Sequence, residues 1–114
     1  MTTLFEKIIA REIPANIEYE DDQCIVIQDI NPAAPIHLLI IPKTPLAKLS
    51  DAVLDDRALL GHLMWVVGEM SRKMGVEDGF RVIVNNGEGG GQTVFHLHLH
   101  LLAGRTFSEA ELAP

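Results

Sequence analysis

Three histidines at alternate positions near the C-terminus are the residues of this chain best suited to chemistry. They lie in the run from Phe95 to Leu102, where His96, His98 and His100 alternate with leucines. Successive side chains of a β-strand point to opposite faces, so a strand here places the imidazoles together and the leucines against a core. Imidazole, with an ordinary pKa of about 6.5, can serve as base, nucleophile or metal ligand near neutral pH. The alternation predicts a reactive histidine face.

A zinc site is the main alternative for this face. Two histidines two residues apart on one strand can share a zinc ion with a third ligand from elsewhere. No cluster of cysteine, histidine or carboxylate stands beside the run in the sequence, and the adjoining loop is rich in glycine rather than acidic. A purely structural role is a further alternative, although packing alone rarely requires adjacent ionisable groups. We expect no metal and no cofactor, with histidine itself as the reacting group.

A glycine-rich loop, from Asn86 to Thr93, leads into the histidine run. Glycine permits a positive φ and lets the backbone approach a ligand closely, and consecutive N–H groups can hold an anion. The loop precedes a strand, whereas the P-loop and the dinucleotide-binding loop precede a helix, so neither fingerprint applies. Alone it is typical of a hairpin loop. Next to the histidines it predicts a phosphate cradle, with Gln92 and Thr93 as side-chain donors.

Three further polar residues are ambiguous from the sequence. His37 lies inside an apolar run, where a single histidine is more often a satisfied core residue than a reacting one. Asp29 precedes a turn that it could simply cap. His62 falls on the polar flank of a long helix and receives no role.

Net charge, cysteine content and the length of apolar stretches limit which partners and which compartment are expected for this chain. The 114 residues carry a formal net charge of −7, which argues against a polymeric nucleic-acid partner but not against one small nucleotide. Cys24 is the single cysteine, so no disulfide can form within the chain and a reducing compartment is expected. The N-terminus lacks the apolar core of a signal peptide, and no stretch approaches the ~20 apolar residues of a membrane span. We expect a cytoplasmic protein with no membrane partner.

The elements expected around these residues form one α+β domain over residues 1–114, with about five strands and one long helix. Periodicity predicts a short helix over 3–11, ended by Pro14, and a long helix from about 55 to Gly75. Turn residues and alternation predict a hairpin of strands over 17–20 and 24–28. Further strands are expected over 36–41, 80–85 and 94–102. The last two strands are expected to be antiparallel neighbours because a short loop joins them. Trp65 lies away from the centre of the helix's apolar stripe, which is typical of a partner surface or of a residue at the core edge.

Together these segments resemble the histidine triad (HIT) family of nucleotide hydrolases and transferases, over nearly the whole chain. The family signature His-φ-His-φ-His-φ-φ, with φ apolar, matches His96 to Leu102 at every position. The flanking segments are similar to the Hint-like branch, the purine nucleoside phosphoramidases: Asp29 to Lys43, Leu60 to Met64, Gly90 to Val94 and Ala103 to Arg105.

The resemblance implies a role for each matched residue. His98 would attack the α-phosphorus, His100 would bond the phosphate or help proton transfer, His96 would support the site and His37 would join the histidine network. Asp29 would accept bonds from the ribose and Ile30 would lie against the base. The phosphate and the leaving group would be held by Asn85, Gly91, Gln92 and Thr93.

The implied fold is an antiparallel sheet of about five strands with one long helix and a short N-terminal helix, usually in a homodimer. The implied function is hydrolysis of AMP–amine P–N bonds through a covalent nucleotidyl-histidine. The alternatives are a dinucleoside polyphosphate hydrolase of a sister HIT branch and a nucleotide-binding regulatory protein. Two departures bear on the leaving group. Thr44 stands where many relatives have a histidine, and the tail from Thr106 carries no tryptophan.

Overall fold

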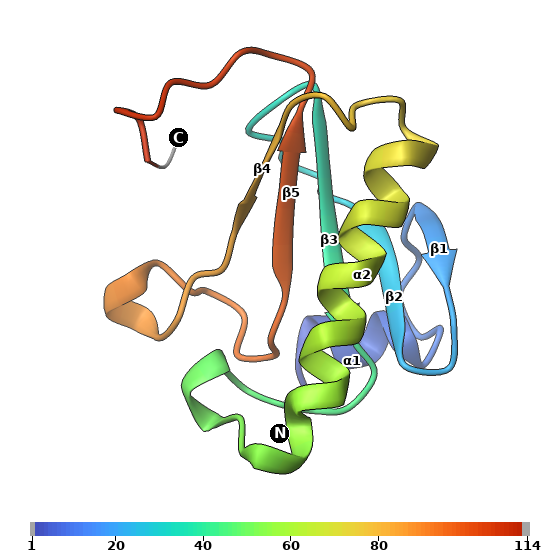
Figure 1. The fold of residues 1–114 in the computed structure, drawn as a ribbon. Helices are drawn as coiled ribbons and strands as arrows, with labels where there is room; N and C mark the ends of the chain where they lie inside the picture. Colours follow the sequence, from blue (N-terminus) through green and yellow to red (C-terminus); the bar gives the residue numbers. More distant parts are fainter. Residues whose placement is uncertain (1, 113–114) are drawn as a thin grey trace.

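The computed structural model describes residues 2–112, which form a five-stranded antiparallel sheet with two helices (Figure 1). The helices are α1 (Leu4–Ile9) and α2 (Arg57–Lys73), and the strands are β1 (Ile17–Glu20), β2 (Cys24–Gln28), β3 (Ile36–Pro42), β4 (Phe80–Ile83) and β5 (Leu99–Ala103). The strand order is β1-β2-β3-β5-β4, with every neighbouring pair antiparallel. The expected α+β class and the antiparallel pairing of the last two strands are confirmed.

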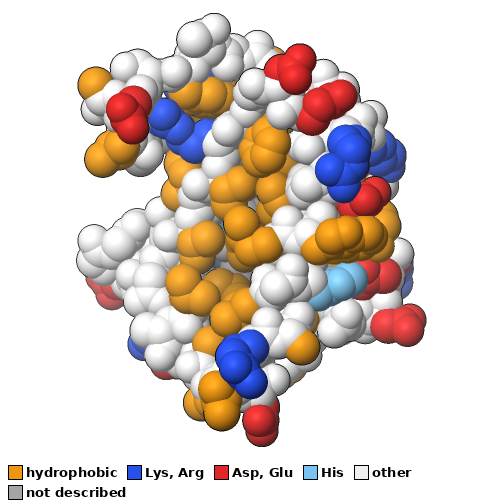
Figure 2. Space-filling view, in the orientation of Figure 1, with side chains coloured by type: hydrophobic (Ala, Val, Ile, Leu, Met, Phe, Trp, Pro, Cys, Tyr) orange, Lys and Arg blue, Asp and Glu red, His pale blue; other side chains and the backbone are white. Residues whose placement is uncertain are grey.

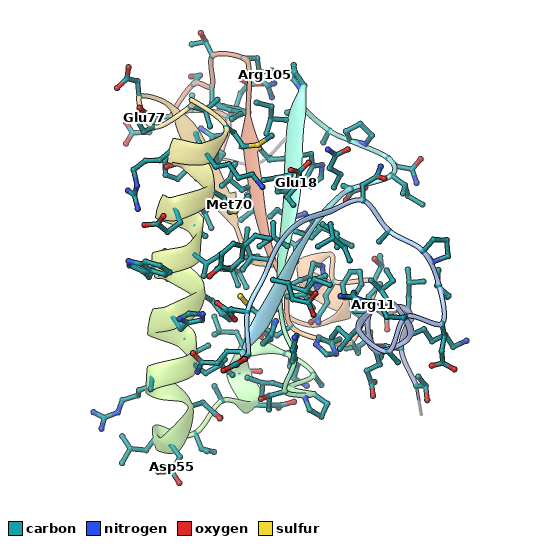
Figure 3. All side chains as sticks on the ribbon, turned by 90° about the vertical axis from the view of Figure 1, so that its right-hand side faces the viewer. Arg11, Glu18, Asp55, Met70, Glu77 and Arg105 are labelled. Carbon is teal, nitrogen blue, oxygen red and sulfur yellow. The ribbon has the colours of Figure 1, made fainter. Side chains whose placement is uncertain are left out.

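The sheet separates two apolar clusters. Helix α2 stands on one side of the sheet and α1 on the other (Figure 3). The α2 side holds Met70 and its helical neighbours together with the three leucines of the histidine run, Leu97, Leu99 and Leu101. The α1 side holds Phe5 and Ile8 against alternate residues of β2 and β3. Strands β2 and β3 are therefore buried on both faces, which explains why their sequences are almost continuously apolar.

Helix α2 buries the apolar stripe that the sequence predicted, and the chain leaves the helix at Gly75. The N–H of Val53 bonds Asp56 Oδ2 (2.8 Å) in the turn before the helix. After the helix, Gly75 adopts φ +70° and donates to Arg72 O, while the N–H of Val76 donates to Ser71 O. This Schellman arrangement confirms Gly75 as the stop. Within residues 2–112, neither helix combines the length and the apolar character needed to cross a bilayer.

Helix α1 is shorter than the sequence predicted. It begins after a capping box, in which the Thr3 side chain accepts the N–H of Glu6 and the Glu6 carboxylate accepts the N–H of Thr3. It ends at Ile9 rather than residue 11, because Arg11 adopts a left-handed conformation with φ 63°. The chain thus leaves the helix before Pro14 can act as its stop.

The histidine strand is also shorter than predicted. Strand β5 begins at Leu99 rather than at residue 94, because its ladder with β3 ends at the Ile40–Leu99 pair, and Ile41 and Pro42 of β3 pair only with β2. The N–H of Leu97 instead donates to Leu46 O (2.7 Å). Strand β4 likewise ends at Ile83, two residues early. The alternation of faces nevertheless continues back through residue 96, so the three histidines stay on the α1 side.

Candidate functional site

His98 is oriented by a backbone oxygen two residues earlier. Its Nδ1 lies 2.8 Å from the carbonyl oxygen of His96, which can only accept, so Nδ1 carries the proton. In a neutral imidazole the other nitrogen, Nε2, then keeps its lone pair. The His98 side chain is buried, and its ring lines a cavity on the α1 side of the sheet. The site therefore presents a nucleophilic nitrogen to that cavity.

His100 is oriented by a second chain of hydrogen bonds that begins at a backbone N–H. Ala33 N–H donates to Nδ1 of His37 (3.0 Å), so the proton of a neutral His37 sits on Nε2. That Nε2–H donates to Nδ1 of His100 (2.9 Å), which places the His100 proton on its own Nε2. Among the described residues His100 Nε2 has no partner and is shielded from water. It is an unsatisfied donor, suited to an incoming phosphate oxygen.

Asp29 completes this group. One of its oxygens, Oδ2, lies 3.5 Å from Nε2 of His37, and the other accepts the N–H of Asn31 (2.8 Å). The predicted turn cap is thus real, and it holds the carboxylate beside the histidines. Ile30, next in the chain, is 87% exposed at the rim of the cavity.

His96 has a different environment from the other two. It is 1% exposed, and its Nε2–H donates to the carbonyl of Pro42 (2.6 Å), tying residues 96–98 to the end of β3. Its Nδ1 has no partner among the described residues. Since its own carbonyl orients His98, His96 supports the site through both side chain and backbone.

Three histidines of the site, His37, His98 and His100, are held neutral near pH 7. Burial lowers the pKa of His98, with a further contribution from His96, and the bond to the His96 carbonyl opposes this only in part. Burial also lowers the pKa of His100 to about 4, helped by the neighbouring His98 and His37. The pKa of His37 is lowered by burial too, against the attraction of Asp29. The proton positions assigned above to His37, His98 and His100 exist only when these rings are neutral.

The cavity in front of these rings measures about 310 Å³. Its floor is formed by residues of β2 and β3 and by His98 and His100, and one whole wall comes from the N-terminal segment. The lining residues are Leu4, Phe5, Ile8, Ile13, Pro14, Ala15, Ile27, Gln28, Asp29, Ile30, Asn31, Leu39, Thr93, Val94, His98 and His100. An apolar chamber with polar groups at one end can take a flat, apolar ring joined to a polar group.

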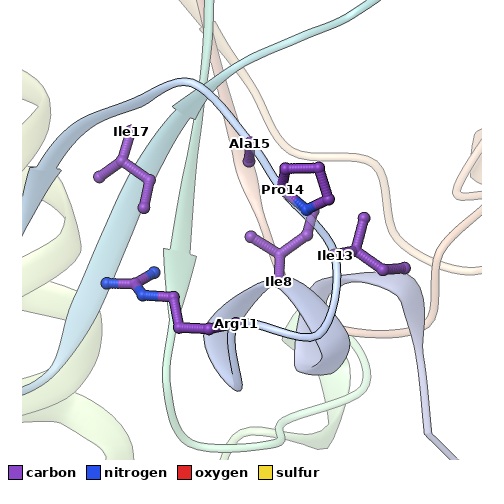
Figure 4. Close-up of a pocket in the computed structure, with 6 residues that line it drawn as sticks. All are labelled: Ile8, Arg11, Ile13, Pro14, Ala15 and Ile17. Atoms are coloured by element: carbon purple, nitrogen blue, oxygen red, sulfur yellow. The ribbon is translucent and has the colours of Figure 1, made fainter.

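A second hollow of about 270 Å³ lies beside the first (Figure 4). It shares Ile8 and the segment 13–15 with the first cavity and adds Arg11 and Ile17. Arg11 pairs with Glu20, so its charge is already engaged. We assign this hollow no chemistry.

The glycine-rich loop is a folded turn organised by Gln92. The Gln92 amide donates to the carbonyls of Ala47 (2.8 Å) and Val94 (2.9 Å) and accepts the N–H of Gly87 (2.8 Å). The side chain is buried and fully occupied by these bonds. It therefore positions the loop, and direct contact with a phosphate would require one of these bonds to break.

The other loop residues that the sequence predicted as phosphate ligands differ in whether their backbone N–H groups are free and in whether they line the cavity. The N–H groups of Gly91 and Gln92 donate within the loop, whereas the exposed Thr93 has a free backbone N–H among the described residues and lines the cavity. Asn85 packs beside Gly91 and does not line the cavity. Contact of these four residues with a substrate stays a prediction.

Two groups in residues 2–112 have ligand atoms within 4.8 Å of one another, close enough to share a metal ion. Asp29, His37 and His100 form one, but its two facing nitrogens are 2.9 Å apart and share a proton. Asp21, Cys24 and His62 form the other, where Asp21 accepts His62 Nε2 (2.6 Å) and two backbone N–H groups. In each group an imidazole nitrogen that could bind a metal is already engaged by a neighbouring side chain.

Sequence reasoning missed two contacts of this site. The ring of Phe5 lies edge-on against His98, with centroids 4.9 Å apart, and Ala33 N–H sets the proton position of His37. Neither residue type signals chemistry, and both depend on tertiary placement. His62, which received no role, bonds Asp21 outside the site.

Comparison with known proteins agrees with this geometry. The HIT domain family model matches residues 10–107. An uncharacterized HIT-like protein of Synechocystis is 58% identical over 106 residues, covering 93% of either chain. A HIT family hydrolase from Legionella pneumophila is similar in structure, with a TM-score of 0.92 and 41% identity over 95% of this chain and 97% of its own. Another from Clostridium thermocellum has a TM-score of 0.91 and 44% identity over 94% of either chain.

The matched region includes the three alternating histidines, the loop before them and the strand that carries His37. The chain belongs to the HIT domain family, whose solved relatives include named hydrolases.

Proposed function

We propose that the chain hydrolyses purine nucleoside phosphoramidates, cleaving the P–N bond of an AMP–amine through a covalent nucleotidyl-His98. One observation carries the proposal. The His96 carbonyl holds the His98 proton on Nδ1, leaving Nε2 as a free nucleophile beside the unsatisfied Nε2–H of His100. This pair supports attack on a phosphorus whose oxygen is bound at the same time.

The reaction proceeds as two displacements. Nε2 of His98 attacks the α-phosphorus, a P–N bond to His98 forms, and the bond to the amine breaks. The amine leaves with a proton that the exposed Thr93 hydroxyl relays to it from solvent water. Water then attacks the phosphorus, the P–N bond to His98 breaks, and one proton of the water returns to solvent, which releases the nucleoside monophosphate and restores the neutral imidazole. His100 Nε2–H and the free Thr93 N–H offset charge on the phosphate oxygens in both steps.

The nucleoside is proposed to lie in the apolar cavity. Its dimensions and lining support a base packed among Ile8, Ile27 and the segment 13–15. The carboxylate of Asp29, at the polar end of the cavity, is placed to accept hydrogen bonds from a ribose. These neighbours support an adenine or guanine, whose large ring surface suits an apolar chamber.

The decisive experiment is hydrolysis of an AMP–amine phosphoramidate with trapping of the labelled protein. We expect AMP release, label on His98, and at least a thousandfold loss in His98→Ala, the size typical of a lost nucleophile. His62→Ala is the matched control, because it removes a histidine outside the site. Label on any other residue would refute the mechanism. Faster cleavage of a diadenosine polyphosphate would favour the sister-branch alternative.

Two further assays separate the remaining alternatives. Full activity after treatment with a chelator supports the scheme above, whereas its loss would favour a metal centre at Asp29, His37 and His100. If His98→Ala binds AMP and retains its cellular role, the chain is better described as a nucleotide-binding regulatory protein.

We also propose a homodimer, in which the long helices and the β4 edges of two copies meet. Gly61 has open space where a Cβ would lie, and the neighbouring Met64 and Trp65 are about half exposed. Glycine within a helix costs about 1 kcal/mol relative to alanine. Because nothing within one copy crowds Gly61, packing within that copy does not explain why a glycine stands there. Strand β4 is an edge strand, and hydrophobic side chains form a band down this face (Figure 2). A second copy would cover all of these features.

A further inference from the structure

Phe5 packs directly against the proposed nucleophile. Its ring centroid lies 4.9 Å from that of His98 with the planes at 76°, and 6.2 Å from that of His96 at 85°. Phe5 is itself 4% exposed. The ring of His98 also meets that of His100, with centroids 5.0 Å apart at an angle of 61°. The hydrogen bond to the His96 carbonyl fixes one atom of the His98 ring, and the two neighbouring rings confine its rotation.

The helix that carries Phe5 also builds the cavity. Leu4, Phe5 and Ile8 of α1, together with Ile13, Pro14 and Ala15 after it, make up six of the sixteen lining residues. A ligand in the apolar chamber would therefore press on the same short segment that touches His98. No other helix among the described residues lines this cavity.

Helix α1 depends on its surroundings for its position. It has only six residues, fewer than an isolated helix needs in water, so packing must hold it in place. The capping box of Thr3 and Glu6 fixes its start, and the ion pair of Arg11 with Glu20 fixes the chain after it. Between these anchors the helix rests on the apolar cluster of the α1 side. Extra apolar contact from a ligand would secure it further.

We propose that Phe5 is a positioning residue for His98, and that α1 couples occupancy of the cavity to the orientation of the His98 ring. The proposal deepens the proposed function and rests on it for the identity of the occupant. Phe5 acts through His98 and not on the substrate's reacting atoms. Its effect is expected in the proton position of His98 and in kcat, more than in binding.

The first test needs no substrate. In the whole chain, the two ring nitrogens of His98 are followed by ¹⁵N NMR in the wild type, in Phe5→Leu and in Leu4→Ala. We expect a single Nδ1–H form in the wild type and in Leu4→Ala, and a mixture of the two neutral forms in Phe5→Leu. Leu4 is the matched control, since it lies on the same helix and lines the same cavity but is exposed and outside the buried cluster that holds the helix. A single form in Phe5→Leu would overturn the proposal, and Phe5→Met substitutes for it if the leucine variant fails to fold.

The second test uses adenosine, which has a base and ribose but no phosphate. Saturating adenosine is expected to shift the His98 ring signals of the wild type and to shift them much less in Phe5→Leu. Equal shifts in both proteins would overturn the coupling. If adenosine does not bind the wild type, the nucleoside site of the proposed function fails, while the first test still decides the role of Phe5.

Kinetics with the phosphoramidate separate positioning from binding. We expect Phe5→Leu to lower kcat about tenfold with KM changed less than about threefold. Leu4→Ala, which removes an exposed lining residue of the same helix, should raise KM and leave kcat. A Phe5→Leu variant whose defect lies wholly in KM would contradict a positioning role.

Discussion

Nε2 of His37 lies 2.9 Å from Nδ1 of His100, and this contact determines which His100 nitrogen carries the proton. The orientation originates at Ala33 N–H, which occupies the other nitrogen of His37. His37 is thus more than a core histidine. It fixes the proton of a partner that lies far from it in sequence.

His37→Ala should lower kcat about tenfold, the equivalent of one lost hydrogen bond of about 1.4 kcal/mol. Without its donor, His100 can place its proton on either nitrogen, and only one arrangement suits a phosphate oxygen. Steady-state kinetics with the phosphoramidate measure the change, with His62→Ala as control. An unchanged kcat would remove His37 from the site.

The acid limit of activity should lie below the ordinary histidine range. His98 must be neutral to attack, and burial lowers its pKa and that of His100, the latter to about 4. The pH profile of kcat/KM is therefore expected to stay flat from pH 7.5 to below pH 6.5 and to fall only at more acidic values. A midpoint at or above pH 6.5 would show that the rings are not shielded as described.

Stability should decrease as the pH falls from about 6.5 towards 4. In the unfolded chain histidines take up protons near pH 6.5, whereas the folded chain keeps His37, His98 and His100 neutral to lower pH. The unfolded state then binds more protons, so the free energy of unfolding falls with acidification. Urea unfolding across this range measures it. His100→Asn should flatten the slope, and an equal slope would contradict the explanation.

Gly91→Ala should destabilise the loop while Gly89→Ala should not. Gly91 has φ +90°, a conformation that costs a residue with a Cβ about 1 kcal/mol or more. Gly89 has no positive φ and open space around it. Thermal unfolding is expected to show a loss of about 1 kcal/mol for Gly91→Ala and less than about 0.5 kcal/mol for Gly89→Ala. Equal effects would mean that the turn is not constrained.

Met64→Glu should yield monomers if the helix faces meet in a dimer. Met64 is 55% exposed, so a charge there costs a single copy little but would be buried between two. Light scattering after gel filtration distinguishes the masses. Glu69→Gln, a change at an exposed ion pair with Arg72 on the same helix, serves as the control. A wild-type protein that is monomeric at all concentrations would reject the dimer.

Local patterns predicted much of the fold. The hairpin strands match their predicted bounds, because a turn at Asp21 separates a strand of alternating polarity from a mainly apolar one. The start of β5 was not predictable, because it depends on where the ladder between β3 and β5 ends, at the Ile40–Leu99 pair. The alternating pattern correctly placed His96, His98 and His100 on one face, where the rings of His96 and His98 lie against Phe5 and that of His98 against His100. The proton positions and the Phe5 contact follow only from tertiary placement.

The cavity in front of His98 has a further consequence for turnover. None of its sixteen lining residues is lysine or arginine, and Asp29 adds a negative charge at its polar end. A nucleoside monophosphate formed there would carry two negative charges and meet only neutral donors, with no ion pair to hold it. Repulsion from a chain of net charge −7 would assist its escape, so product release should be fast and should slow at high ionic strength, where salt screens this repulsion.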